Sequence, residues 1–234
     1  MHQIEFKNVS KEYTPGSKVL DNVSFVINQG EFLFIVGPSG AGKSTLVKLL
    51  IKEEASTGGE MLFREESVLE IPQEKVPDLR RKIGVVFQDY KLLDSKTVSE
   101  NVSIALEVVD SKKEEIRNIV PNVLSLVGLA DHASFYPKQL SGGEKQRVAI
   151  ARALAHEPDV LIADEATGMI DPDSADQVIE ILEKINSLGT TIIMCTHDER
   201  IVNRLTKRVI RIERGKIVSD KEGGTYRDQS LGKS

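Results

Sequence analysis

The chain has 234 residues, enough to bury a sizeable core, and its 40% hydrophobic and 29% charged residues describe an ordinary soluble protein. The formal net charge of −5 at pH 7 argues against a nucleic-acid-binding surface, because such surfaces gather positive charge. A single cysteine, Cys195, excludes an internal disulfide. We expect no signal peptide, and no apolar run approaches the roughly 20 residues that span a bilayer, so another chain would supply any membrane-spanning part.

The sequence predicts two kinds of strand, one half-buried and one buried on both faces. Residues 4–9 and 20–27 predict a half-buried antiparallel sheet, because apolar residues alternate with others in the second run. Residues 31–36 are apolar after the first position, as expected of a strand buried on both faces. Similar buried runs follow at residues 83–87, 160–163 and 190–196.

Helical patterns lie between the buried runs. Apolar residues recur at helical spacing over residues 175–185, where Gly189 can serve as the stop signal. They recur again over residues 116–127, but Pro121 interrupts this pattern and predicts a break with a second helix starting near it.

Buried strands that alternate with helices predict a single α/β domain with a mainly parallel sheet. Residues 98–154 show helices without buried strands, which predicts an inserted α-helical subdomain. The α/β core then covers approximately residues 1–97 and 155–220, and it includes a hairpin around Arg214-Gly215. The polar, Gly-rich residues 221–234 predict a loosely ordered tail.

Residues 37–44 fit the pattern G-x-x-x-x-G-K-[ST] at every fixed position, after a buried strand and before an apolar helix. The motif consists of Gly37, Pro38, Ser39, Gly40, Ala41, Gly42, Lys43 and Ser44. Its glycines let the backbone direct amide groups at phosphates, and the helix dipole adds to the attraction. Lys43 would pair with the outer phosphates, and the Ser44 hydroxyl would bind Mg²⁺. A Gly-rich turn that binds nothing is the alternative, but it leaves the strand, loop and helix context unexplained.

The buried run of residues 160–163 ends in two acidic residues, Asp164 and Glu165. Ligands bind at the carboxyl ends of the strands in α/β sheets, so both carboxylates are candidates for a site. Asp164 can hold Mg²⁺ through its water shell, and Glu165 can polarise the attacking water. A strand followed by a solvated acidic turn explains this motif equally well on its own, and the phosphate loop favours the functional interpretation.

Leu140-Ser141-Gly142-Gly143-Glu144 precedes a helical pattern that runs to Leu154. Ser141 and Glu144 form a capping box for that helix, but a cap does not require two glycines. Bare backbone at a helix N-terminus is also a second phosphate site in the same chain. A chain with one complete phosphate loop needs such a site only if it closes over the ATP of a neighbouring chain.

In this order, the motifs resemble those of the ATP-binding cassette (ABC) ATPases, a P-loop NTPase family. Residues 37–44 resemble the Walker A loop, residues 160–165 the Walker B strand, and residues 140–144 the ABC signature. The resemblance covers nearly the whole chain. It implies an ABC-type α/β core with an N-terminal antiparallel β subdomain, ATP and Mg²⁺ as ligands, and a homodimer that forms head-to-tail on ATP.

The resemblance also implies roles for residues outside these motifs. Tyr13 would stack on adenine, and Thr45 would join the nucleotide contacts of the phosphate loop. Gln88 would touch Mg²⁺ and water and sense a membrane partner. Asp171 fits the D-loop, and His197 fits the switch histidine at the γ-phosphate. Taken singly, Tyr13, Gln88 and His197 are typical of ordinary strand-end residues, and their order and context favour the functional interpretation.

Two positions depart from the family pattern. The family usually has proline after the catalytic glutamate, where this chain has Ala166, and leucine before the D-loop aspartate, where this chain has Ile170 after Met169. Neither change removes a reacting group. Both bear on the rigidity of the turn over residues 165–171 and on the turnover rate.

Four segments are similar to the FtsE group of bacterial cell-division ATPases: residues 83–93, 96–102, 208–210 and 224–226. This likeness implies an FtsX-like membrane partner, regulation of cell-wall hydrolysis, and a cytoplasmic location on the inner face of the plasma membrane. ATPases for lipoprotein release and macrolide export share much of the pattern, so a transporter subunit for such a cargo or another solute stays open.

Two readings from other classes are disfavoured. Soluble ABC ATPases that act on nucleic acid or ribosomes usually carry a long coiled coil between the Walker motifs or two cassettes, and this chain shows neither. A small-molecule kinase would use the phosphate loop but has no use for residues 140–144.

Overall fold

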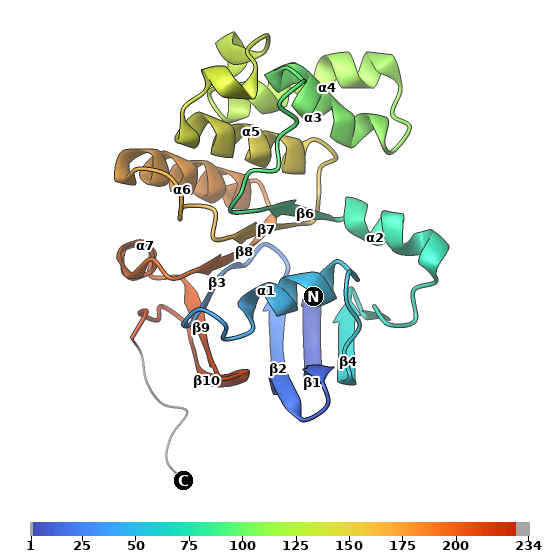
Figure 1. Cartoon of the computed structure of the whole chain (residues 1–234), viewed down its shortest axis with the longest axis vertical. Helices are drawn as coiled ribbons and strands as arrows, with labels where there is room; N and C mark the ends of the chain where they lie inside the picture. The colour runs from blue at the N-terminus through green and yellow to red at the C-terminus, as the bar shows by residue number, and fades with distance from the viewer. Residues whose placement is uncertain (1, 228–234) are drawn as a thin grey trace. The chain divides into compact units, whose positions relative to one another are not determined.

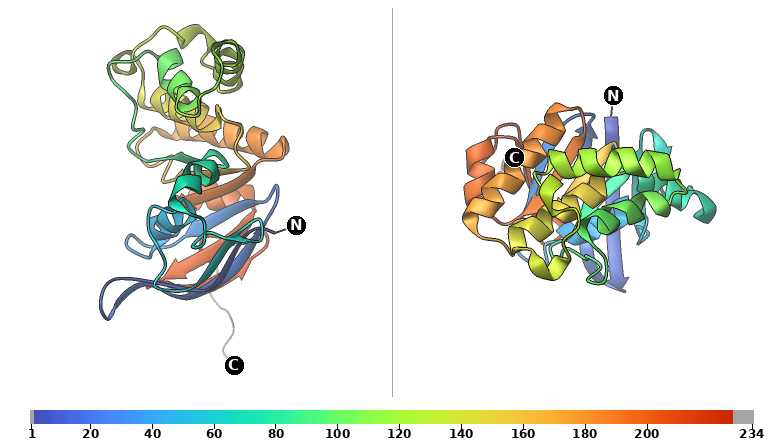
Figure 2. Two further views of the ribbon diagram at one scale, coloured as in Figure 1. Left: turned by 90° about the vertical axis from the view of Figure 1, so that its right-hand side faces the viewer. Right: turned by 90° about the horizontal axis from the view of Figure 1, so that it is seen from above.

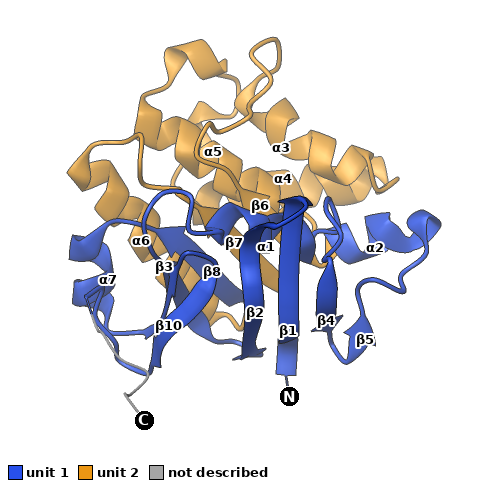
Figure 3. Ribbon diagram, turned by 60° about the horizontal axis from the view of Figure 1, so that its bottom comes forward, with its two compact units in different colours: residues 1–80, 191–234 blue, residues 81–190 orange. Residues whose placement is uncertain are grey.

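The computed structural model describes residues 2–227 of the chain. The structure divides into two compact units (Figure 3): unit 1 comprises residues 1–80 and 191–234, and unit 2 comprises residues 81–190. The chain leaves unit 1 once and returns to it once, so unit 2 is a continuous insertion in unit 1.

Unit 1 contains an antiparallel sheet near the N-terminus of the chain (Figure 1). Its strand order is β2-β1-β4-β5, with β1 (His2–Thr14), β2 (Ser17–Asn28), β4 (Gly58–Phe63) and β5 (Glu66–Ser67). The rings of Phe6 and Phe25 stack on one face of the β1–β2 pair with their centroids 4.5 Å apart. The antiparallel sheet predicted from residues 4–9 and 20–27 is confirmed.

The second group of strands in unit 1 is mainly parallel. Its order is β10-β9-β3-β8, with β3 (Phe32–Val36), β8 (Thr191–Thr196), β9 (Arg208–Glu213) and β10 (Lys216–Lys221). β3 runs parallel to both β8 and β9, and every residue of β3 and β8 is buried, as continuously apolar strands require. β9 and β10 form the predicted antiparallel hairpin.

The helices of unit 1 are short. They are α1 (Lys43–Leu50), α7 (Glu199–Leu205) and the 3-10 turn η1 (Gln73–Lys75), which leads into α2 (Val76–Arg81) at the border of the unit. α1 begins at Lys43, within the phosphate-loop motif, and its apolar face buries Leu46, Leu49 and Leu50.

Unit 2 consists of two parallel strands and a group of helices. The strands are β6 (Ile83–Val86) and β7 (Val160–Asp164); the helical elements are α3 (Val98–Glu107), α4 (Lys113–Leu126), η2 (Ala130–His132), η3 (Pro137–Gln139), α5 (Gly142–Leu154) and α6 (Pro172–Ser187). α3 packs against α4 and α5, and α5 also packs against α6. Figure 2 shows the green α3 and α4 lying beside the yellow α5.

The predicted break at Pro121 is wrong. α4 is one continuous helix with Pro121 inside it. Proline lacks the backbone N–H that would bond to the carbonyl of Arg117, but Pro121 lies on the exposed face, where water can satisfy that carbonyl. The buried residues Val120 and Leu124 hold the other face of the helix in place.

The predicted subdomain limits at residues 98 and 154 stay predictions, since the two units divide the chain at other positions. Residues 228–234 of the predicted tail lie outside the described residues. Before them, Tyr226 is fixed by its backbone: its N–H donates to Asn203 Oδ1 at 2.9 Å, and its carbonyl accepts from Arg211 at 2.6 Å.

Arg208 joins four segments of unit 1 through one guanidinium group. It makes a bidentate pair with Asp220 of β10, with both N···O distances 2.7 Å. Its Nη1 also donates to the backbone carbonyl of Val26 on β2 at 2.7 Å and to Glu31 at 2.8 Å. The hydrogen-bonded carboxylate of Asp220, followed by that of Glu31, raises the pKa of Arg208 above its ordinary value. This contact ties the edge strands of both sheets together.

We expect Arg208→Met to destabilise the protein by about 3 kcal/mol, because it leaves two carboxylates and a carbonyl without their partner. The midpoint of urea unfolding measures this loss. Arg214→Met is the matched control, since Arg214 is exposed in the turn of the same hairpin. Equal unfolding midpoints for the two variants would show that Arg208 does not join the sheets.

Candidate active site

The phosphate loop connects β3 to α1 and is pressed against two neighbouring strands. Gly37 and Gly42 have positive φ angles of 151° and 109°. A Cβ atom at position 37 would overlap the carbonyl oxygen of Ile212 on β9. At position 42 it would lie 2.7 Å from the Leu20 side chain and 2.9 Å from the Val19 carbonyl oxygen. Only glycine fits both positions, while the loop residues 38–40 remain exposed.

The Lys43 side chain folds back over this loop. The residue is only 7% exposed, and its ammonium donates to the Gly37 carbonyl at 2.8 Å and to the Pro38 carbonyl at 3.3 Å. The positive charge is therefore held at the loop and the N-terminus of α1, which favours an anion there. Ser44 is exposed in the first turn of α1, and Thr45 is 8% exposed.

His197 leaves the sheet beside the phosphate loop. β3 and β8 are parallel, with Val36 opposite Thr196, so Gly37 and His197 each follow directly after a paired residue. His197 is exposed, and Asp198 caps α7 by accepting hydrogen bonds from two backbone amides of its first turn. Unit 1 therefore brings the histidine and the loop to the same end of neighbouring strands.

Tyr13 lies near the end of β1 and is half exposed. The ammonium of Lys11 lies 4.9 Å from the centre of its ring. Lys11 itself is fixed by the Glu54 carboxylate at 2.8 Å and by the Ala55 carbonyl at 2.7 Å. The aromatic ring thus presents surface on which a planar ligand can stack.

In unit 2, Gln88 and Glu165 also follow neighbouring parallel strands. Val86 of β6 lies opposite Ala163 of β7. Gln88 comes two residues after Val86, and Glu165 comes two residues after Ala163. A Cβ atom at Gly168 would lie 3.3 Å from Gln88 Nε2, so the Gln88 amide lies against the turn after Glu165. Asp164 is the last residue of β7 and is partly buried.

Glu165 has a left-handed backbone conformation with φ of 53°, which is uncommon outside glycine and asparagine. Its carbonyl accepts a hydrogen bond from the Gly168 amide at 3.0 Å and closes a tight turn. Ala166, at the position of the family proline, is 2% exposed. Burial and this hydrogen bond hold the turn although proline is absent.

Asp171 ends this turn as the N-cap of α6. Its carboxylate accepts a hydrogen bond from the Ser174 amide at 2.9 Å. Hydrogen bonds from Ser174 lower the pKa of Asp171 below its usual value. The carboxylate is therefore fixed and charged at the N-terminus of α6.

The predicted capping box at the start of α5 is present. Glu144 Oε2 accepts from the Ser141 amide at 2.8 Å and from the Ser141 hydroxyl at 2.7 Å, while Ser141 Oγ accepts from the Glu144 amide at 3.2 Å. The hydrogen bonds from Ser141 lower the pKa of Glu144. The other Glu144 oxygen lies 3.3 Å from His132 Nε2, a contact that the sequence did not indicate.

The structure supplies a packing reason for one of the two signature glycines. A Cβ atom at Gly143 would overlap Ser174 Oγ and lie 2.6 Å from Ser174 Cβ, so Gly143 allows α5 to approach α6 closely. At Gly142 it would lie 3.2 Å from the Tyr90 hydroxyl. The sequence did not reveal either contact, because the partner residues are remote along the chain.

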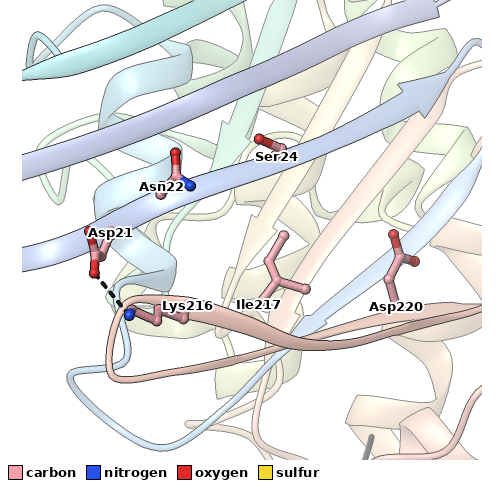
Figure 4. A pocket seen from close by; sticks show the side chains of 6 residues that line it. All are labelled: Asp21, Asn22, Ser24, Lys216, Ile217 and Asp220. Atoms are coloured by element: carbon pink, nitrogen blue, oxygen red, sulfur yellow. Dashed lines mark ion pairs between the residues drawn. The ribbon is translucent and has the colours of Figure 1, made fainter. Parts of the chain in front are cut away.

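A hollow of about 390 Å³ lies between β2 and β10 of unit 1, and none of its lining residues belongs to a motif (Figure 4). Its lining residues are Asp21, Asn22, Ser24, Lys216, Ile217 and Asp220. The Asp21 carboxylate and the Lys216 ammonium form an ion pair across it at 3.1 Å. The pocket is therefore not part of the candidate site.

Comparison with known proteins identifies a family. A family model described as ABC transporter matches residues 20–168. The cell division ATP-binding protein FtsE of Bacillus subtilis is 51% identical over 223 residues, which cover 95% of this chain and 98% of the relative. FtsE of Mycobacterium tuberculosis is 44% identical, covering 95% of this chain and 97% of the relative.

Two solved structures are similar to this fold. The structure of cbiO1 from Clostridium perfringens, described as part of the ABC transporter complex cbiONQ, has a TM-score of 0.88 and 31% identity, and covers 95% of this chain and 89% of that one. The cassette MJ0796, a dimer in a post-hydrolysis state bound to ADP and Pi, has a TM-score of 0.83 and 33% identity, with coverages of 96% and 99%. Within residues 2–227 of the present chain, no helix is long and apolar enough to cross a membrane.

We expect Lys43→Ala to weaken ATP binding by roughly a hundredfold, because the phosphates lose a buried charged donor. Titration with a fluorescent ATP analogue measures the affinity. Lys48→Ala is the matched control, since Lys48 lies on the same helix but its side chain is 45% exposed. Parental affinity in the Lys43 variant would overturn the assignment of the phosphate loop.

Proposed function

The chain belongs to the ABC transporter family, and from this premise we propose that it is the FtsE-like ATPase subunit of a membrane complex. Its fold is that of an ABC ATPase cassette, and it is an ATP-binding ATPase. We further propose which residues bind and hydrolyse ATP, which residues hold the magnesium ion, how two chains form a dimer, and which kind of membrane protein is the partner. The observation that carries it is one phosphate loop, with its buried lysine, plus a second helix N-terminus, capped by Ser141, that belongs to no phosphate loop of its own.

ATP would bind with its phosphates on the backbone of residues 37–44. Lys43 supplies the counter-charge, and the first turn of α1 with Ser44 and Thr45 adds polar contacts. The exposed ring of Tyr13 would stack on the adenine base. Support for this placement comes from the two glycines that press the loop against β2 and β9 and leave residues 38–40 accessible.

The donors at the site suit Mg²⁺, which prefers oxygen ligands. The Ser44 hydroxyl is exposed at the loop. In unit 2, Asp164 is the last residue of β7, and Gln88 follows two residues after the end of β6. These three residues would hold the ion. When bound, Mg²⁺ neutralises charge on the phosphates.

Glu165 would orient and polarise the water that attacks the γ-phosphate. Its carboxylate extends from a left-handed residue just after β7, so the backbone rather than a flexible loop sets its direction. His197 would donate to the γ-phosphate, because it leaves β8 beside the phosphate loop. Gln88 would contact the water from the neighbouring strand end.

Each active site would be completed by a second copy of the chain, related head-to-tail. Ser141, Gly142, Gly143 and Glu144 form a fixed helix start that can accept the γ-phosphate of ATP bound to the other copy. Asp171 would contact the partner at the same interface. Because ADP lacks the γ-phosphate, it would not hold the two chains together.

The membrane partner would be FtsX-like, and the complex would regulate cell-wall hydrolysis during division from the cytoplasmic face of the plasma membrane. Support comes from the FtsE relatives, which this chain matches over nearly its full length. The docking surface would be Gln88 with residues 89–101. An ABC transporter subunit for lipoprotein, macrolide or another solute is the second candidate, and identification of the membrane protein that co-purifies with the chain separates the two. We expect no nucleic acid partner, given the net charge of −5.

We expect Glu165→Gln to bind ATP, to hydrolyse it at least about a hundredfold more slowly, and to accumulate as an ATP-bound dimer. The amide keeps the shape of the side chain but removes the charge that orients water. Ser141→Arg in the same background should break this dimer without weakening ATP binding to the monomer. Sedimentation with ATP, with ADP and without nucleotide measures the dimer, and phosphate release measures hydrolysis.

Near-parental hydrolysis by Glu165→Gln, with or without the membrane partner, would show that Glu165 does not orient the attacking water. A dimer that survives Ser141→Arg would contradict the proposed interface.

We expect Leu93→Asp and Lys91→Glu to reduce co-purification with the membrane partner about tenfold while leaving ATP affinity unchanged, because both side chains lie on the docking surface. Leu69→Asp is the matched control: Leu69 and Leu93 are both 40% exposed, but Leu69 lies in unit 1. Unchanged co-purification of both docking variants would remove residues 89–101 from the interface.

A further inference from the structure

The segment after Gln88 has a conformation that its own sequence does not favour. Tyr90 and Lys91 both have left-handed backbones, with φ angles of 53° and 48°. Two consecutive left-handed residues that are neither glycine nor asparagine are uncommon, and such a conformation persists only where the surroundings impose it. The Lys91 amide donates to the Asp89 carbonyl within the segment, and contacts from outside the segment add to this one hydrogen bond.

The Arg152 side chain supplies that contact. Its Nη2 donates to the Tyr90 carbonyl at 2.8 Å, and its Nη1 donates to the Lys91 carbonyl at 2.6 Å. The planar guanidinium thus donates from both of its terminal nitrogens to two adjacent carbonyl oxygens, a forked contact that the single ammonium of a lysine does not reproduce. Burial lowers the pKa of Arg152 from its ordinary value, so the contact lies in a partly desolvated place.

Arg152 comes from α5, the helix that begins at the signature. Ser141 caps the first turn of α5, and Arg152 lies in the last. A single rigid helix thus connects the carbonyls of Tyr90 and Lys91 with the proposed contact to the ATP of a partner chain.

The Tyr90 side chain makes a second connection. Its hydroxyl donates to the Met169 carbonyl at 3.4 Å and lies 3.2 Å from the position that a Cβ atom at Gly142 would occupy. Tyr90 therefore lies against both the start of α5 and the turn between Glu165 and Asp171. Burial raises the pKa of its hydroxyl, which stays protonated as a donor.

The far end of the same segment is fixed by Asn101 of α3. This side chain is fully buried, accepts from the Leu93 amide at 2.8 Å and donates to the Leu93 carbonyl at 3.1 Å. It also donates to the carbonyls of Lys96 at 3.1 Å and Thr97 at 2.9 Å. Because α3 packs against α5, residues 90–97 are attached at both ends to one group of helices.

We infer that Arg152 is a positioning residue that makes residues 90–93 of the docking surface and helix α5 move as one body. A membrane partner that pushes on residues 90–93 then displaces Ser141 at the other end of the helix. Without Arg152 the segment leaves its left-handed conformation, and the push no longer reaches the signature. This inference depends on the proposed docking surface.

The first test uses the chain alone, so it does not depend on any partner. Hydrogen exchange is measured for the amides of residues 88–97 in Arg152→Ala and Arg152→Lys, against the parent. Arg147→Ala is the matched control, because Arg147 lies on the same helix but donates to the carbonyl of Val127. We expect exchange in this segment to rise about tenfold or more in Arg152→Ala and to stay parental in the control. Parental protection in Arg152→Ala would overturn the inference.

The second test uses the chain in complex with its co-purified membrane partner in lipid nanodiscs. We expect Arg152→Ala to keep the KM for ATP and the basal kcat of the free chain, and to lose the increase in kcat that the partner causes. Arg152→Lys should restore part of that increase, because an ammonium can still donate to one carbonyl. If Arg152→Ala does not fold, the increase in kcat that the partner causes is measured in Arg152→Lys alone, and we expect it to be smaller than in the parent. Full stimulation of either Arg152 variant would overturn the inference.

The two failures are distinguishable. If Leu93→Asp and Lys91→Glu both leave partner binding intact, the docking surface is wrong whatever Arg152 does. If Leu93→Asp abolishes binding but Arg152→Ala is stimulated like the parent, the docking surface stands and the transmission through Arg152 is wrong.

Discussion

The register of the parallel strands is the constraint on which the rest of the site depends. In unit 1, Val36 lies opposite Thr196, so the phosphate loop and His197 start at the same level of the sheet. In unit 2, Val86 lies opposite Ala163, so Gln88 and Glu165 follow at equal distances along the chain. A slip of one residue would turn every following side chain to the opposite face. Strand pairing therefore decides which functional groups can meet before any loop adopts its conformation.

The loops between the strands are then held by contacts rather than by their own preferences. The phosphate loop is pressed so closely against β2 and β9 that only glycine fits at positions 37 and 42. Glu165 keeps a left-handed backbone in a turn closed by the Gly168 amide, and Tyr90 with Lys91 keeps one because Arg152 binds both carbonyls. At Glu165 and at Tyr90 with Lys91, the fold imposes a disfavoured conformation at a place that the proposed mechanism uses.

The sequence predicted the parts that depend on local pattern. Continuously apolar runs indicated β3, β6, β7 and β8, and the capping box at Ser141 was visible from its spacing. Pro121 misled because the predicted break ignored solvent, which can satisfy a carbonyl on the exposed face of α4. Arg152 and the packing of Gly143 on Ser174 left no signal, because they depend on backbone or small-residue contacts across 31 to 62 positions of the chain. The roles given to the site residues stay predictions, since strand-end positions fit them without proving the chemistry.

The central claim is that each active site combines the phosphate loop of one chain with the signature of another. Its most direct measurement mixes two inactive variants, Lys43→Ala and Ser141→Arg, and follows phosphate release. A head-to-tail heterodimer of these chains contains one site with both parts intact, whereas neither homodimer contains any. We predict that an equal mixture regains about a quarter of the parental rate, because half of the dimers are mixed and each has one working site. A mixture no more active than the two variants measured separately would contradict the claim.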